Sequence, residues 1–217
     1  MINKNTPELW IDEYPFPKSI DHKYSRGMVL INSGPVYQTG AARLAGRSAM
    51  RVGAGAVKLV CDKAAASILE PQISVELISV IENKNDFQLL LKDKKISSVL
   101  IGPGNGISDE TKARTLMALA FVDNVVIDAD AITSFENNPE ELFIDTYSHT
   151  ILTPHEGEFL RLFDHNINRI EDKVMKTLEA SKVAGSIIVL KGSDTIIASP
   201  SGEVVVNSSE APYLATA

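Results

Sequence analysis

The chain has 217 residues, 44% of them hydrophobic and 23% charged, which is enough apolar content for one ordinary globular domain with a core. Its formal net charge is −7 and it contains no basic stripe, so we expect no nucleic-acid partner. No apolar run approaches the roughly 18 residues of a membrane span, and no basic segment followed by an apolar one opens the chain, so we expect a cytoplasmic protein with no membrane partner.

Short β-branched runs alternate with alanine- and leucine-rich stretches, after an extended N-terminal arm that we predict for residues 1–20. Buried strands are predicted at 27–31, 56–60, 98–102, 124–128, 150–153 and 186–192. Helices are predicted over 39–55, 108–121 and 168–185, with Ser108 as an N-cap and Gly185 as a stop. The stretch "DTIIASPSGEVVVN" predicts a hairpin. This order predicts a single α/β domain over residues 1–217, with a mostly parallel sheet between helices.

The single cysteine, Cys61, lies in the apolar run "GAVKLVC". It has no second cysteine for a disulfide and no cysteine or histidine cluster for zinc. We therefore predict a small buried residue on a strand rather than a catalytic one.

Two glycine-containing turns follow predicted strands, where the ligand cleft of an open parallel sheet lies. In "NSGPVYQTGAA", Gly34, Gly40 and Ala41 would let a ligand approach the backbone at a helix N-terminus, although an ordinary turn fits equally. In "GPGNG" (102–106), three glycines in five residues favour a backbone cradle for a phosphate or a ring edge. The alternative is a plain turn. The motif is neither Gly-x-Gly-x-x-Gly nor a Walker A loop, which weakens hydride-transfer and nucleoside-triphosphatase hypotheses.

Acidic side chains and a histidine follow two further predicted strands. In "VVIDADAI", Asp128 and Asp130 would share one side if the strand persists, and could order water around magnesium or accept a substrate hydroxyl; loop carboxylates are the alternative. In "TILTPHEGEF", His155 and Glu158 follow a strand without the second histidine of a zinc site.

The last predicted strand ends in "VLKGSDTII". A lysine with neighbouring Gly, Ser and Thr residues can hold a nucleotide phosphate by charge and hydroxyl contacts. A solvated turn is the alternative for this stretch taken alone.

Together, "GAARLAGRSAMRVGAGAVKLV", "IGPGNG", "VIDADAI", "ILTPHEGEF", "VLKGSDT" and "VVNSSEAPYLATA" resemble the ADP-dependent NAD(P)H-hydrate dehydratases of the ribokinase-like superfamily. The resemblance implies a three-layer α/β/α fold, with a mostly parallel central sheet and a C-terminal hairpin. It also implies a repair reaction. ADP phosphorylates the hydroxyl of (6S)-NAD(P)H hydrate, and elimination of phosphate then regenerates NAD(P)H and leaves AMP.

The resemblance also implies roles for residues that match the family's motifs. The hydrate would be bound by Ala41, Gly104, Gly106, Asp128 and His155. The AMP site would be lined by Lys191, Gly192, Ser193, Asp194 and Thr195. Glu158 would act indirectly on Mg²⁺. ADP is expected as co-substrate ahead of ATP, and a homo-oligomer, commonly a tetramer, is expected as the assembly. Glu156 replaces a common proline of the family and would add negative charge beside the phosphates.

The family's Gly-x-Gly-Asp segment, with the aspartate that takes the substrate proton, would start directly after Ala217. "SSEAPYLATA" (208–217) then reads as the lead-in to that segment, in a C-terminally incomplete domain, and no residue within the chain is assigned the catalytic role. Two alternatives stay open: a truncated, non-catalytic nucleotide-binding remnant, and a kinase of the same fold acting on a vitamin precursor or a sugar.

Overall fold

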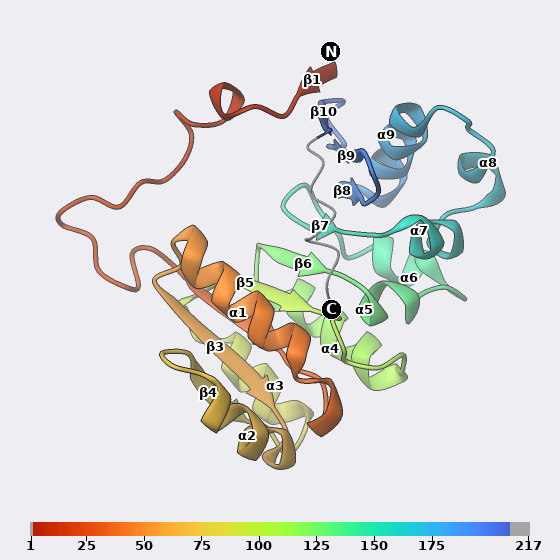
Figure 1. Cartoon of the computed structure of the whole chain (residues 1–217). Helices are drawn as coiled ribbons and strands as arrows, with labels where there is room; N and C mark the ends of the chain where they lie inside the picture. The colour runs from red at the N-terminus through yellow and green to blue at the C-terminus, as the bar shows by residue number, and fades with distance from the viewer. Residues whose placement is uncertain (1, 209–217) are drawn as a thin grey trace. The chain divides into compact units, whose positions relative to one another are not determined.

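The computed structural model describes residues 2–208, whose contacts divide into two compact units (Figure 1). Unit 2 is Pro17–Ser134, and unit 1 combines the residues up to Phe16 with those from Phe135 onward. The single domain expected over residues 1–217 stays a prediction.

Unit 2 contains five parallel strands in the order β6-β5-β2-β3-β4. Their bounds are β2 Met28–Asn32, β3 Ala56–Cys61, β4 Leu77–Val80, β5 Ile96–Ile101 and β6 Val125–Ile127. The four strands predicted in this region are confirmed to within two residues at each end. β4 was not predicted, because "LISV" is short and largely exposed, which leaves a weak apolar signal.

Helices connect the strands of unit 2, as parallel neighbours require. They are α1 Gly40–Val52, α2 Lys63–Leu69, α3 Lys84–Leu91, α4 Asp109–Phe121 and α5 Asp130–Thr133, with 3-10 turns at Val36–Gln38 and Glu70–Gln72. Ser108 caps α4 as predicted, since its hydroxyl accepts a hydrogen bond from the Thr111 amide at 3.1 Å. α1 ends three residues earlier than predicted, where Gly53 takes a φ of 120°.

The two faces of this sheet are covered by different helices. Ile31, Leu59 and Cys61 point to one face and pack with residues of α1 and α2; Figure 1 shows α1 lying over β2 and β3. The opposite face is reached by α4, whose Arg114 donates to the Asn32 side chain of β2 at 3.1 Å. The sheet is thus buried between helices. The loops that follow the carboxyl ends of its strands form the region described below as a candidate site.

Unit 1 contains a short parallel pair that continues into a hairpin. Its strand order is β1-β10-β9-β8-β7, with bounds β1 Ile2–Lys4, β7 Ile151–Leu152, β8 Ile187–Leu190, β9 Thr195–Ala198 and β10 Val204–Asn207. β7 and β8 are parallel, whereas β8-β9 and β9-β10 are antiparallel. The predicted C-terminal hairpin and mostly parallel sheet are confirmed.

The N-terminal residues add a strand that the sequence did not indicate. β1 pairs in parallel with β10, and Asn5 Nδ2 donates to Asn207 Oδ1 at 2.9 Å beyond the strand. The arm predicted for residues 1–20 therefore begins as an edge strand.

Of the helices that the structure describes in unit 1, only α9 lies largely within a predicted one. These helices are α6 Pro139–Phe143, α7 Glu156–Leu162, α8 His165–Asn168 and α9 Lys173–Ala184, with a 3-10 turn at Pro7–Leu9. The helix predicted over 168–185 is wrong in its first part. Asp172 starts a new helix there by accepting from the Met175 amide at 2.9 Å. Gly185 ends α9 in the left-handed conformation, as predicted. Within residues 2–208, none of these helices has the length and apolar content to cross a bilayer.

Cys61 is 1% exposed on β3, and burial raises the pKa of its thiol to about 11. We predict that native protein at pH 8 reacts with iodoacetamide far more slowly than protein unfolded in urea, by at least about tenfold, because the thiolate is the reactive form. Burial of the neutral thiol stabilises the fold below its ordinary pKa of 9.0, and this contribution is lost as the pH rises towards 11. Mass spectrometry of alkylated protein measures both rates; equal rates would contradict the buried position.

Candidate functional site

The side chain of Asn105 ties the glycine loop 102–106 of unit 2 to the neighbouring backbone. Its Oδ1 accepts from the Gly102 amide and from Asn32 Nδ2, both at 2.8 Å. Its Nδ2 donates to the carbonyl of Asn32 at 2.9 Å and to that of Pro103 at 3.3 Å. Because Arg114 of α4 fixes the Asn32 side chain in turn, the loop is tied to both β2 and α4.

The loop amides are mostly satisfied within the protein, so the loop is not the open cradle that three glycines indicated. Gly102 donates to Asn105 Oδ1, Asn105 donates to the Gly102 carbonyl at 2.9 Å, and Gly106 donates to Asp130 Oδ2 at 2.8 Å. Pro103 has no N–H. Among residues 2–208 the Gly104 amide finds no acceptor, which leaves it as the donor that this loop offers to a ligand.

Gly104 lies against the turn that leads into α1. A Cβ added at Gly34 would be 1.9 Å from the Gly104 carbonyl oxygen, and one added at Gly104 would be 2.8 Å from the Gln38 carbonyl oxygen. The close approach of the glycine loop is therefore enough to require a glycine at position 34. Gln38 precedes Ala41 by three residues, so the structure brings Ala41 and Gly104 to the same corner.

The N-terminus of α1 adds further donors at this corner. Thr39 is its N-cap but makes no side-chain cap, and the first turn contains no acidic residue. Within residues 2–208 the first amides of the helix therefore meet no acceptor. They carry partial positive charge, an arrangement that favours a phosphate or another anion.

The two predicted carboxylates of "VVIDADAI" do not share a strand face, because β6 ends at Ile127. Ala129 takes a φ of 48° and a ψ of −119°, the one positive φ of a non-glycine residue between residues 2 and 208. Such strain costs about 1–3 kcal/mol. The turn separates Asp128 from Asp130, and it is Asp130 that reaches the loop, through the Gly106 amide.

In unit 1, His155 and Glu158 cap the start of α7 reciprocally. His155 Nδ1 accepts from the amides of Gly157 at 2.9 Å and Glu158 at 3.3 Å, while Glu158 Oε2 accepts from the His155 amide at 2.8 Å. Since Nδ1 is an acceptor, the proton of the neutral ring is on Nε2, which lies 3.2 Å from Glu158 Oε1. The exposed His155 ring is thereby oriented by a carboxylate whose side chain is only 7% exposed.

The structure also brings the predicted lysine loop beside this cap. His155 and Lys191 form a parallel β-bridge, and the Lys191 amide donates to the Pro154 carbonyl at 2.9 Å. Lys173, at the start of α9, donates from Nζ to the Asp194 carbonyl. A second cation thus lies against the stretch Lys191–Thr195, whose residues are exposed or half-buried.

The negative charge expected from Glu156 is paired. Lys176 of α9 donates from Nζ to Glu156 Oε1, and the lysine side chain is 11% exposed against 50% for the glutamate. The same ammonium lies 5.4 Å from the centre of the Phe159 ring. Glu156 therefore adds little net charge beside the lysine loop.

The described residues contain no cluster of three or more His, Cys, Asp or Glu side chains able to hold a metal ion. Both oxygens of Glu158 already face His155, so this buried carboxylate does not fit as a direct magnesium ligand. Mg²⁺ in nucleotide sites is usually held by phosphates, water and one or two carboxylates. An indirect action of Glu158 is compatible with that arrangement.

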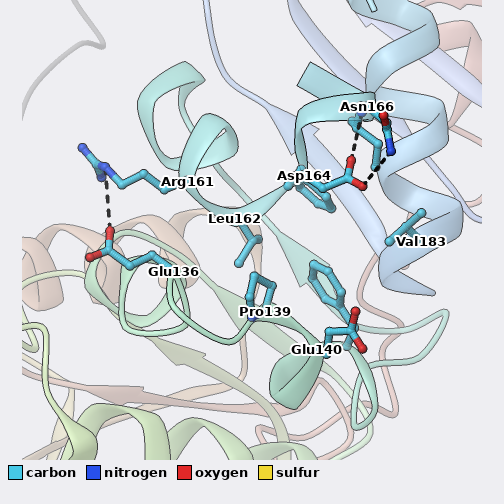
Figure 2. Close-up of a pocket in the computed structure, with 11 residues that line it drawn as sticks. Glu136, Pro139, Glu140, Arg161, Leu162, Asp164, Asn166 and Val183 are labelled. Atoms are coloured by element: carbon cyan, nitrogen blue, oxygen red, sulfur yellow. Dashed lines mark hydrogen bonds and ion pairs between the residues drawn. The ribbon is translucent and has the colours of Figure 1, made fainter. Parts of the chain in front are cut away.

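Two cavities of the structure do not include the residues predicted to bind the hydrate or the nucleotide. In unit 1, a pocket of about 520 Å³ lies among α6, α7, α8 and α9 (Figure 2). Its lining includes the apolar Leu162 and Val183. It also includes Glu136 and Arg161, whose Oε2 and Nε atoms are 4.0 Å apart. It lies at the C-terminal end of α7, whereas His155 caps the N-terminal end. In unit 2, a polar cavity of about 340 Å³ is lined by Asn105 together with residues that follow β2, β3 and β4.

Several residues that shape the candidate site of unit 2 or that of unit 1 were not identified by the sequence analysis. Asn32, Asn105 and Lys173 were not assigned, and Asp130 was noted but left out of the predicted site. Only Asn105 carried a usable signal, since an asparagine inside a glycine turn is typical of side-chain-to-backbone bonding. The others act through contacts between elements far apart in the sequence.

Comparisons with known proteins identify the fold and the family of the chain. Solved structures similar to the chain include a ribokinase-like superfamily protein from Enterococcus faecalis, with 22% identity and a TM-score of 0.83 over 99% of this chain and 74% of that one. Another is the ADP/ATP-dependent NAD(P)H-hydrate dehydratase from Bacillus subtilis, co-crystallised with ATP and Mg²⁺, with 26% identity and a TM-score of 0.79 over 99% of this chain and 75% of that one. The ribokinase-like fold is thus confirmed.

Curated relatives point the same way. A bifunctional NAD(P)H-hydrate repair enzyme from Gloeobacter violaceus is 34% identical over 89% of this chain and 38% of its own length. Its counterpart from Thermofilum pendens is 28% identical over 95% of this chain and 41% of its own length. The chain spans about two fifths of these relatives. The NAD(P)H-hydrate dehydratase family model matches residues 29–217, so the chain belongs to the NAD(P)H-hydrate dehydratase family.

Proposed function

We propose that the chain dehydrates (6S)-NADH or NADPH hydrate, with ADP as the phosphoryl donor and AMP and phosphate as the other products. The observation that carries this proposal is the family match over residues 29–217. The free backbone amides of Gly104 and of the start of α1 add hydrogen-bond donors for such a ligand. The matched relatives named as repair enzymes and the Bacillus subtilis dehydratase support it.

The hydrate is assigned to the corner of unit 2 at which Ala41 and Gly104 meet. The unsatisfied amides at the start of α1 suit a phosphate of the dinucleotide, and the Gly104 amide can donate to a second polar group. Gly106 and Asp128 belong to the same loop system, but the Gly106 amide is already used by Asp130. We propose that Gly106 and Asp128 form part of this corner. For unit 1 we propose, separately, that the exposed ring of His155 contacts a ligand.

The nucleotide is assigned to the stretch Lys191, Gly192, Ser193, Asp194 and Thr195 of unit 1. Two ammonium groups, those of Lys191 and Lys173, and the hydroxyls of this stretch supply the charge and hydrogen bonds that a phosphate requires. Magnesium would come with the nucleotide phosphates, where it neutralises charge during transfer. Glu158 would act on it only indirectly.

The reaction consists of two steps, a phosphoryl transfer and an elimination. The β-phosphoryl group of ADP passes to the hydroxyl oxygen of the hydrate while the hydroxyl proton is taken up, which leaves AMP. Phosphate then departs with its C–O bonding electrons and the nicotinamide ring loses a proton, which restores NADH or NADPH. In phosphoryl transfer most of the rate comes from positioning and charge neutralisation, which are the tasks of the residues assigned above. No residue between 2 and 208 is assigned the proton transfer.

We further propose that ADP is preferred to ATP, that the protein works in the cytoplasm without nucleic acid or membrane partners, and that it assembles as a homotetramer. The segment "SSEAPYLATA", predicted to lead into the catalytic loop, lies outside the described residues from position 209 onward.

The function is tested by incubating the full chain with hydrated NADH, Mg²⁺ and either ADP or ATP, while NADH absorbance and AMP release are followed. We predict recovery of NADH with ADP, in a 1:1 ratio to AMP. Nucleotide binding without recovery would contradict the activity and favour a binding remnant. Phosphorylation of a sugar or vitamin precursor, without any recovery of NADH, would favour the kinase alternative.

The Glu156–Lys176 ion pair gives a separate prediction about the proposed nucleotide site at Lys191–Thr195. Lys176→Met leaves Glu156 unpaired beside the lysine loop and should weaken AMP binding by about two- to fivefold, the size expected of a partly exposed ion pair. The double variant with Glu156→Gln should restore the affinity. Lys182→Met, which breaks an ion pair on the same helix, is the control and should change nothing. Calorimetric titration at low and high salt measures each affinity; a double variant as weak as Lys176→Met would contradict the account.

A further inference from the structure

The turn Asp128–Ala129–Asp130 holds both ends of the glycine loop. At one end, the Asp128 amide donates to the Ile101 carbonyl at 3.1 Å, and the Asp128 carbonyl lies so close to Gly102 that an added Cβ there would be 1.7 Å from its oxygen. At the other end, the Asp130 carboxylate accepts from the Gly106 amide at 2.8 Å. The residues on either side of Ala129 thus contact the first and last residues of the loop.

Ala129 takes the strained conformation that makes these two contacts possible together. With a φ of 48° it reverses the chain directly after β6, so that Asp128 stays at the strand end while Asp130 begins α5 and faces the loop. A residue with a Cβ keeps such a conformation only when its surroundings determine it. Here the surroundings are the contacts at the two ends of the loop.

The loop needs such support, because its own backbone is permissive. Gly102, Gly104 and Gly106 all have positive φ values, of 122°, 70° and 81°. Without ties at both ends a glycine segment samples many conformations, and only some of them present the Gly104 amide to a ligand. The apparent affinity of a ligand falls in proportion to the fraction of molecules in the competent conformation.

We propose that Asp130 is a positioning residue for substrate binding: through its hydrogen bond to the Gly106 amide, and with the strained Ala129 turn, it keeps the Gly104 amide directed at the hydrate. The role rests on the proposed function, and it adds an indirect contribution by Asp130 to the hydrate contacts predicted from the sequence. Asp130 acts as a hydrogen-bond acceptor here, so its charge is dispensable.

The acceptor role separates this inference from a charge role, such as proton transfer or magnesium binding. Asp130→Asn keeps an acceptor oxygen for the Gly106 amide and removes the charge, whereas Asp130→Ala removes both. Ala129→Gly relieves the strain but leaves the turn available, so it should raise the melting temperature slightly. Asp123→Ala, on the exposed loop after α4, is the matched control.

The experiment measures hydrated NADPH affinity, AMP affinity and amide hydrogen exchange for the full chain and each variant. We expect Asp130→Ala to weaken hydrate binding by about tenfold, with AMP binding unchanged and faster exchange confined to residues 102–106. Asp130→Asn should stay within about twofold of wild type in all three measurements. Asp123→Ala should match wild type.

Two outcomes would overturn the inference. If Asp130→Asn fails as Asp130→Ala does, the charge matters and the role is not positioning. If Asp130→Ala leaves both hydrate affinity and exchange at 102–106 unchanged, the hydrogen bond does not order the loop. A wild-type chain that binds no hydrate would instead contradict the proposed function and the substrate part of the inference, while hydrogen exchange would still decide whether Asp130 orders the loop.

Discussion

The proposed hydrate site of unit 2 depends on the amide side chain of Asn105. Four hydrogen bonds from this one group fold the loop 102–106 onto β2, and Asn32 and Arg114 extend the tie to α4. An amide side chain that satisfies both its oxygen and its nitrogen fixes a backbone more narrowly than apolar packing does, because each bond prescribes a direction. The glycines around it permit the close approach to Gln38 and Asp128. Among residues 2–208, the Gly104 amide is the loop donor that finds no acceptor.

The proposed nucleotide site of unit 1 lies beside a pair of side chains that accept hydrogen bonds from each other's backbone. His155 and Glu158 satisfy each other's backbone amides at the start of α7, so the histidine ring is oriented and its proton is placed by the same contacts that begin the helix. The parallel bridge to Lys191 then sets the lysine loop beside the ring. In both units, polar side chains fix the backbone next to the residues that we assign to a ligand.

The sequence indicated the fold well, and it indicated the roles of individual residues less well. Buried strands such as β2, β3 and β5 are rich in Val, Ile and Leu. The caps at Ser108 and Gly185 have local chemistry that the sequence states directly. The exposed β4 and the edge strand β1 lack that signal. Asp130 could not be separated from Asp128, because the separation depends on a positive φ at Ala129, a residue that gives no warning of it.

The central claim is that the glycine loop offers one amide, that of Gly104, to the substrate. The most direct test is a titration of the full chain, labelled with ¹⁵N at its 13 glycines, with hydrated NADPH, followed by amide NMR. The account predicts that the Gly104 resonance shifts strongly, while those of Gly102 and Gly106, whose amides are already bonded, shift little. Saturable binding that shifts Gly102 and Gly106 and leaves Gly104 in place would contradict it.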